Sequence, residues 1–187
     1  MHLHFALPFM TNSYLIAPGP SGPAVLIDPG AFDLGLLEMV ENNGYYIRSI
    51  LVTRPDRPST DGIRTVLKIY DAQIYTAARR IDDFPCKTVA GGESFDLHGM
   101  SVEVLGAQAY SRDAVMFKVD NLLFTGDILT AGSVGKAGNP YGAALLAAEL
   151  KERFRSLDDN TLVFPGSGPP STLEAEKKFN SHLQISS

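Results

Sequence analysis

Short apolar runs separated by turn residues recur in two successive halves of this chain, and they constrain its fold more than any other feature. The strand-like runs of the first half are 13–16, 24–27, 47–52 and 72–76. Those of the second half are 101–105, 115–119, 122–125 and 161–164. Segments with helical spacing of apolar residues lie among them, at 34–40, 62–70, 143–154 and from 171 onward. Two β-rich halves that each carry helices predict two sheets packed face to face with helices outside.

Turn and cap residues mark several of the boundaries. The segment 18–23 is rich in Pro and Gly and predicts a hairpin between the first two runs. Asp120 and Asn121 form a two-residue connection that is typical of a second hairpin. Gly44 after Asn43 is a plausible helix C-cap, and the stretch Ser171-Thr172-Leu173-Glu174 is a capping-box pattern that predicts the start of a last helix.

The bulk composition indicates an ordinary globular protein of one domain, spanning residues 1–187. The net charge of −5 argues against nucleic acid or an anionic membrane as partner. The longest apolar runs fall short of the ~20 residues needed to span a bilayer. The single cysteine, Cys86, and an N-terminus without a basic, apolar leader pattern predict a cytoplasmic protein without an internal disulfide.

Five short motifs follow one another along the chain in a fixed order. They are Asn12-Ser13-Tyr14-Leu15-Ile16, Leu26-Ile27-Asp28-Pro29-Gly30, Leu123-Phe124-Thr125-Gly126-Asp127, Phe164-Pro165-Gly166-Ser167-Gly168, and Glu176 to Asn180 followed by Leu183. Their order and spacing resemble the metallo-β-lactamase superfamily, and within it the glyoxalase II-like hydrolases. The resemblance implies an α+β fold, the four-layer αββα sandwich. It also implies a hydrolase that uses metal-bound hydroxide, with zinc as the expected metal.

The loop from Thr53 to Gly62 lies where the resemblance places a metal-binding signature, T-H-x-H-x-D-H-x-x-G. Thr53 and Gly62 are in register with its first and last positions. The four ligand positions between them hold Arg54, Asp56, Pro58 and Ser59. The frame of the loop is therefore kept, while its zinc ligands are replaced.

The other ligand positions implied by the resemblance are also altered, with one exception. Tyr110 stands at one histidine position, although a one-residue slip would place Ala109 there, and Ser167 replaces another histidine. Asp127 is kept in kind. The chain's histidines fall at none of these positions: His2, His4, His98 and His182. We therefore expect no zinc or other metal cofactor, even though the family would imply one.

Loss of the metals would leave Asp127 without a counter-charge, which is unfavourable for a half-buried carboxylate. We expect Arg54 or Arg57 to supply it through a bidentate ion pair with Asp127. Arg112 could join these two arginines in an anion site that also includes Tyr110. The same positive charges argue against an oxygen-only Mg²⁺ or Ca²⁺ site.

These residues support three functional hypotheses. The first is a catalytically silent protein that binds a small anion or a protein partner, and its altered site comprises Arg54, Asp56, Ser59, Asp61, Tyr110, Asp127 and Ser167. The second is a hydrolase of thioesters, lactones or phosphoesters that uses a non-standard metal or none, carried by Asp56, Asp61 and Asp127. The third places the function on the surface of a homo-oligomer. The segment 132–136 is Gly-rich and ends in a lysine, but it lacks the Walker spacing and is discounted as a phosphate loop.

Overall fold

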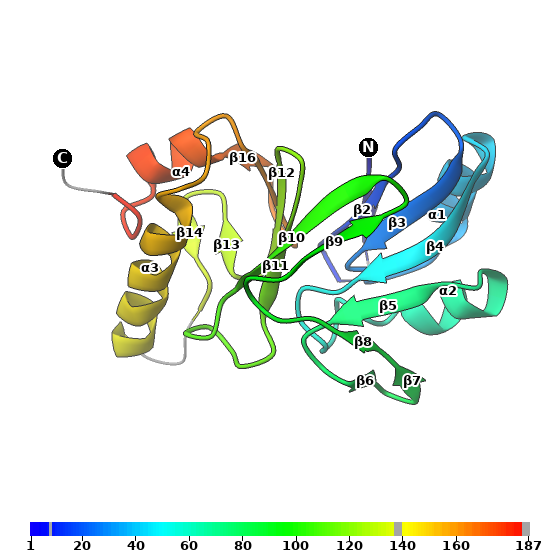
Figure 1. Cartoon of the computed structure of the whole chain (residues 1–187), viewed down its shortest axis with the longest axis horizontal. Helices are drawn as coiled ribbons and strands as arrows, with labels where there is room; N and C mark the ends of the chain where they lie inside the picture. The colour runs from blue at the N-terminus through cyan, green and yellow to red at the C-terminus, as the bar shows by residue number, and fades with distance from the viewer. Residues whose placement is uncertain (8, 137–139, 185–187) are drawn as a thin grey trace.

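Two six-stranded sheets pack face to face and carry helices on both outer sides (Figure 1). The computed structural model describes residues 1–7, 9–136 and 140–184. This arrangement is the four-layer αββα sandwich of the metallo-β-lactamase fold, as the sequence predicts. In the described residues no helix is long and apolar enough to cross a membrane.

The first sheet comes from the N-terminal half and has the order β1-β2-β3-β4-β5-β8. Its strands are β1 (His2–Ala6), β2 (Thr11–Ile16), β3 (Gly22–Ile27), β4 (Tyr45–Leu51), β5 (Gln73–Thr76) and β8 (Lys87–Thr88). The strands β1, β2 and β3 are antiparallel, whereas β3, β4, β5 and β8 are parallel. The helices of this half are α1 (Leu34–Asn42) and α2 (Ile63–Ile69), and they cover its outer face.

The second sheet has the order β16-β15-β12-β11-β10-β9. Its strands are β9 (Ser94–Leu97), β10 (Met100–Gly106), β11 (Val115–Val119), β12 (Leu122–Gly126), β15 (Leu162–Pro165) and β16 (Ser171–Thr172). The outer face packs against α3 (Pro140–Phe154) and α4 (Leu173–Phe179). Two small hairpins complete the described chain, β6 (Arg80–Ile81) with β7 (Phe84–Pro85) and β13 (Leu129–Thr130) with β14 (Ser133–Val134).

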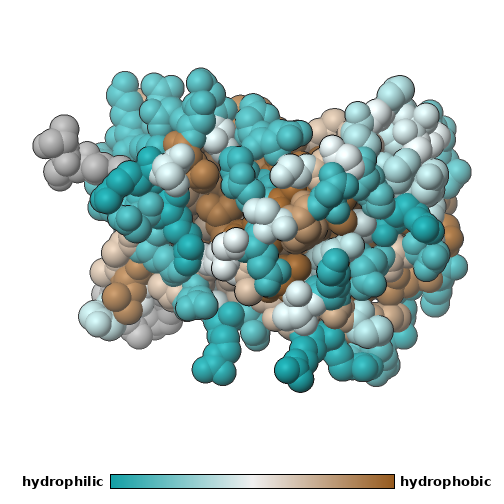
Figure 2. Space-filling view, in the orientation of Figure 1, coloured by the Kyte–Doolittle hydropathy of each residue, from teal (hydrophilic) through white to brown (hydrophobic). Residues whose placement is uncertain are grey.

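The core between the sheets is apolar and holds the two halves together. Tyr14 of β2 packs on Phe124 of β12 and Phe164 of β15, with ring centroids 5.3 and 5.4 Å apart. The Tyr14 hydroxyl also donates a 2.6 Å hydrogen bond to the Pro165 carbonyl, so its one polar atom is satisfied in the core. On the outside, the face drawn in Figure 2 is mostly hydrophilic, with hydrophobic residues showing mainly near its middle.

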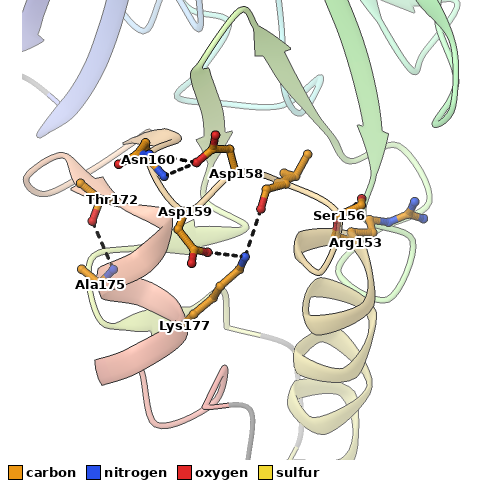
Figure 3. A network of polar contacts seen from close by, with 9 residues as sticks. Arg153, Ser156, Asp158, Asp159, Asn160, Thr172, Ala175 and Lys177 are labelled. Carbon is orange, nitrogen blue, oxygen red and sulfur yellow. Dashed lines mark hydrogen bonds and ion pairs between the residues drawn. The ribbon is translucent and has the colours of Figure 1, made fainter. Parts of the chain in front are cut away.

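The last helix begins one residue later than its capping-box pattern predicts. Thr172, and not Ser171, is the N-cap, and its hydroxyl accepts from the Ala175 amide (Figure 3). The reason is that both residues are extended in β16, where Ser171 is paired with Val163 and Thr172 with Leu162, so the first helical residue is Leu173. Lys177 then ties the helix to the loop before β15 through a 2.7 Å contact with Asp159.

Candidate functional site

The ends of β3 and β4 form one wall of the candidate site. Parallel neighbours finish at the same edge of a sheet, so Asp28 and Thr53 meet directly after these two strands. The Asp28 carboxylate accepts hydrogen bonds from the amide and the hydroxyl of Thr53, each 2.8 Å long. Both residues are buried. This pair fixes where the loop 53–62 begins.

The environment of Asp28 perturbs its acidity. The pKa of Asp28 is raised to about 7, chiefly by burial; the two hydrogen bonds from Thr53 act in the opposite direction, and the nearby charges of Asp127 and Asp56 add to the increase. A carboxyl group with this pKa holds a proton at mildly acidic pH. Because its oxygens are occupied by Thr53, its role is to hold the loop.

The end of β12 forms the opposite wall and requires glycine. Gly126 has a φ of +52°, and a Cβ there would overlap the Thr53 hydroxyl and lie 2.9 Å from Thr53 Cβ. The Gly126 carbonyl accepts from the Gly166 amide at 2.8 Å. The absence of a side chain therefore lets the two sheets close together here, which places Asp127 beside the loop 53–62.

Arg54 joins the altered positions of the site. Its Nε donates to Asp56 Oδ1 at 2.6 Å and its Nη1 donates to the Tyr110 hydroxyl at 3.1 Å. Its Nη2 lies 3.8 Å from Asp127 Oδ2, an ion pair at the long end of the usual range. The expected contact between Arg54 and Asp127 is thus present, but as one long ion pair and not as the bidentate pair that the sequence predicts. The guanidinium also lies over the Tyr110 ring, 5.3 Å from its centroid.

The charges around this cluster act on one another. Burial alone would lower the pKa of Arg54, but Tyr110, Asp56 and Asp127 outweigh it and raise that pKa. Burial raises the pKa of the Tyr110 hydroxyl, Arg54 lowers it, and the two carboxylates add to the increase. At neutral pH the arrangement is therefore a charged guanidinium between two carboxylates, with a neutral phenol beside it.

A cavity of about 300 Å³ opens next to Asp127. It is lined by Tyr110, Asp127, Thr130, Ser133, Val134, Gly135, Lys136 and Ser167. Gly135 allows this geometry, because a Cβ there would collide with the Asp127 carbonyl and with the Tyr110 ring. Lys136 is exposed at the cavity and brings a positive charge, while Thr130, Ser133 and Ser167 bring hydroxyl groups.

The other two arginines of the expected anion site lie elsewhere. Arg57 pairs with Asp61 at 2.9 Å, and its side chain is 82% exposed, so the alternative contact between Arg57 and Asp127 is wrong. Its partner lies four residues away in the same loop and is the nearer carboxylate. Arg112 is exposed and borders a different cavity, so the expected gathering of three arginines at one mouth is also wrong. Ser59 is half-buried farther along the loop.

Several residues of the site have no role that the sequence predicts, among them Asp28, Gly135 and Lys136, and also Thr130 and Ser133 at the cavity. Asp28 lies in a recognised motif, but only the structure shows its bonds to Thr53. Gly135 and Lys136 belong to the segment discounted as a phosphate loop, and the structure places both at the cavity. Their signal was the Gly-rich segment itself, whose position depends on the short hairpin of β13 and β14.

The residues of this site do not fit a zinc ion. Within the described ranges no three His, Cys, Asp or Glu side chains gather closely enough to hold a metal. A guanidinium cannot be a ligand, and Arg54 already contacts both carboxylates of the cluster. Two of the histidines are engaged elsewhere, since His4 bonds Asp33 and His98 bonds Ser49.

Known proteins resemble the chain in both sequence and structure. No protein-family model matches it. The hydroxyacylglutathione hydrolase of Methylobacillus flagellatus is 30% identical over 151 residues, which cover 77% of this chain and 60% of that enzyme. A crystal structure of the B3 metallo-β-lactamase BLEG-1 superposes with a TM-score of 0.84 at 20% identity, covering 98% of this chain and 99% of that one.

A second solved structure, of a protein in a di-iron-bound form, has a TM-score of 0.79 at 27% identity and covers 97% of this chain and 99% of that one. Both superpositions extend over nearly the whole chain. The chain is therefore a metallo-β-lactamase-fold protein with hydroxyacylglutathione hydrolases (glyoxalase II) as homologues at modest identity.

Proposed function

We propose that this protein has lost the zinc site of its fold, is catalytically silent, and binds a small anionic molecule in the cavity beside Asp127. The observation that supports the loss most directly is the position of Arg54, which contacts Asp56, Tyr110 and Asp127 at once. These are three of the positions at which the resemblance implies metal ligands.

Electrostatics favours this interpretation. A metal ion bound to Asp127 would lie within a few ångströms of the Arg54 guanidinium, and like charges repel strongly in a partly desolvated site. Arg54 itself supplies the positive charge that Asp127 needs. Binding of a divalent cation would therefore require Arg54 to leave both of its carboxylate partners.

The cavity also has the chemistry for an anion. Lys136 is exposed at its wall, and the hydroxyls of Thr130, Ser133 and Ser167 can donate hydrogen bonds. Asp127 opposes an anion in the same cavity, but its charge is balanced by Arg54. The anion is therefore expected to bind beside Lys136, and its size is limited by the cavity of about 300 Å³.

Elemental analysis of the purified protein tests the loss of the metal. After incubation with excess Zn²⁺, Fe²⁺ or Mn²⁺ and removal of free ions, we expect far less than one metal per chain and no change in melting temperature with a chelator. One metal per chain that Asp127→Ala removes would overturn the proposal. Asp71→Ala is the matched control, because Asp71 is almost fully exposed and its side chain pairs with Arg48.

Binding of inorganic phosphate, followed by chemical-shift changes, tests the anion. We expect weak, saturable binding that Lys136→Gln abolishes. Lys68→Gln is the control, since Lys68 is an exposed lysine on α2. Equal binding of phosphate by the wild type and by Lys136→Gln would exclude Lys136 as part of the anion site.

A second candidate function is hydrolysis of a thioester, lactone or phosphoester with a non-standard metal or none. The observation in its favour is the similarity to the hydroxyacylglutathione hydrolase, together with an Asp127 carboxylate that is 39% exposed in the cavity. Screens with these three substrate classes distinguish the candidates. Turnover that Asp127→Ala abolishes and Asp71→Ala leaves unchanged would replace the first proposal by the second.

A further inference from the structure

The first ten residues expose an unusual amount of apolar surface. The large hydrophobic side chains exposed there are Met1, Leu3, Phe5, Leu7, Phe9 and Met10. Leu3 and Phe5 belong to β1, where they are 44% and 42% exposed, and Leu7 directly after it is 74% exposed. Contiguous apolar surface of this kind marks interaction sites more often than scattered single residues do.

The strand pairing shows which side of the sheet this surface occupies. Leu3 is paired with Tyr14, and antiparallel partners point to the same face. Tyr14 lies in the core between the two sheets, so Leu3 and Phe5 point to that side as well. His4 points to the other side, where its Nε2 contacts Asp33 at the start of α1.

The second sheet leaves Leu3 and Phe5 of β1 partly uncovered. Tyr14 of β2 bonds Pro165 of β15, which places β2 opposite β15. Beyond β15 the sheet has one more strand, the two-residue β16. The apolar layer between the sheets therefore continues under β1, where Leu3 and Phe5 extend it into solvent.

Among the described residues no strand pairs with the outer edge of β1, which is the first strand in the order of its sheet. Proteins usually protect such an edge with charged residues, because an exposed apolar edge recruits other strands. The first ten residues of this chain contain no Asp, Glu, Lys or Arg. The edge is therefore both apolar and free of charged side chains.

We propose that a second copy of this chain binds here, with β1 pairing antiparallel to β1 of the partner about a two-fold axis. Such pairing is self-complementary, and it joins the two N-terminal sheets into one continuous sheet. Leu3 and Phe5 of both copies then lie on one face and cover each other.

Charge favours a second copy over other occupants. Nucleic acid, an acidic peptide or a lipid headgroup finds no charged side chain to pair with in the first ten residues. Two copies that each carry a net charge of −5 repel one another, and at this edge no acidic side chain adds to that repulsion.

Sedimentation velocity of the full chain over a range of micromolar concentrations tests the proposal. We expect a dimer, and we expect Phe5→Lys to raise its dissociation constant by roughly 100-fold, because two lysines would meet in the interface. Leu145→Lys is the control, since Leu145 is a similarly exposed leucine on α3 and its substitution should leave the dimer intact. A wild type that stays monomeric, or a dimer that Phe5→Lys does not weaken, overturns the proposal.

Hydrogen exchange of the wild type provides a readout that needs no variant. We expect the backbone amides of residues 2–6 to exchange more slowly at high than at low protein concentration. A dimer with no concentration-dependent protection of this strand would place the interface elsewhere and would also overturn the proposal. Neither measurement depends on the anion or on a metal, so the result is independent of the function proposed above.

Discussion

The frame of the site and its altered ligand positions differ in how deeply they are buried and in how closely their residues contact one another. The frame, formed by Asp28, Thr53 and Gly126, is buried and its members fit directly against one another. The altered positions, represented by Arg54 and Asp127, are partly exposed and are joined by a long ion pair. The frame therefore stabilises the fold by itself, whichever side chains stand at the neighbouring positions.

Gly126→Ala should break the frame and give the largest effect. The new Cβ would collide with Thr53 at a positive φ, so we expect a loss of roughly 3 kcal/mol in the free energy of unfolding. Urea denaturation measures it. Gly92→Ala is the control, because Gly92 also has a positive φ but nothing lies within 4 Å of its Cβ position, and it should lose about 1 kcal/mol. Equal losses in the two variants would show that the contact with Thr53 is unimportant.

Asp28→Asn should change how stability depends on pH. The pKa of Asp28 is raised from 3.8 to about 7, so between these values the folded protein keeps a proton that the unfolded chain releases. Its stabilising contribution is therefore complete below pH 3.8, falls as pH rises by up to about 1.4 kcal/mol per pH unit, and is gone above pH 7. The variant should lack this slope in denaturation curves measured across the window. Asp71→Asn should retain it, and a slope unchanged in Asp28→Asn would contradict the assignment.

Arg54→Ala should have a smaller effect on stability, because its partners are partly exposed and solvent screens them. We expect a loss below about 1 kcal/mol by urea denaturation. Removal of the guanidinium also removes the group that lowers the pKa of Tyr110, so the phenol should titrate at higher pH in an ultraviolet titration. A loss as large as that of Gly126→Ala would mean that the altered positions are part of the frame.

Arg57→Ala should have the smallest effect. Its ion pair with Asp61 lies at the surface, with the arginine 82% exposed, and such pairs contribute within about 0.5 kcal/mol. Thermal denaturation should not distinguish this variant from the wild type. A clear loss would show that the loop 53–62 needs this pair for its conformation.

The sequence predicts most of the fold because its turn residues and its spacing of apolar residues agree with the strands and helices of the structure. The turn at Asp120 is a hairpin, as expected, with Val119 paired to Leu122. The strand β1 was not predicted, because its apolar residues Leu3 and Phe5 are on the exposed side and so the usual relation between apolar character and burial is reversed.

The sequence predicts a contact in the site only where the charges of the side chains determine which residues pair. The pairing of Arg54 with Asp127 follows from the need to balance a partly buried charge. The position of Lys136 cannot be predicted in this way, because it depends on the hairpin of β13 and β14. These two-residue strands are too short to show a pattern of apolar residues in the sequence. Arg112 was misplaced because a loop sequence does not reveal the direction of its side chains.

The amide of Asn12 has a consequence for how the protein is made. Its Nδ2 donates to the carbonyls of Pro165 and Gly168, more than 150 residues away along the chain. During synthesis from the N-terminus these carbonyls emerge from the ribosome late, so the first hairpin cannot be fastened until almost the whole chain has been translated. Until then the apolar edge of β1 is displayed by a nascent chain whose second sheet is incomplete, and this interval is when the protein most needs protection from aggregation.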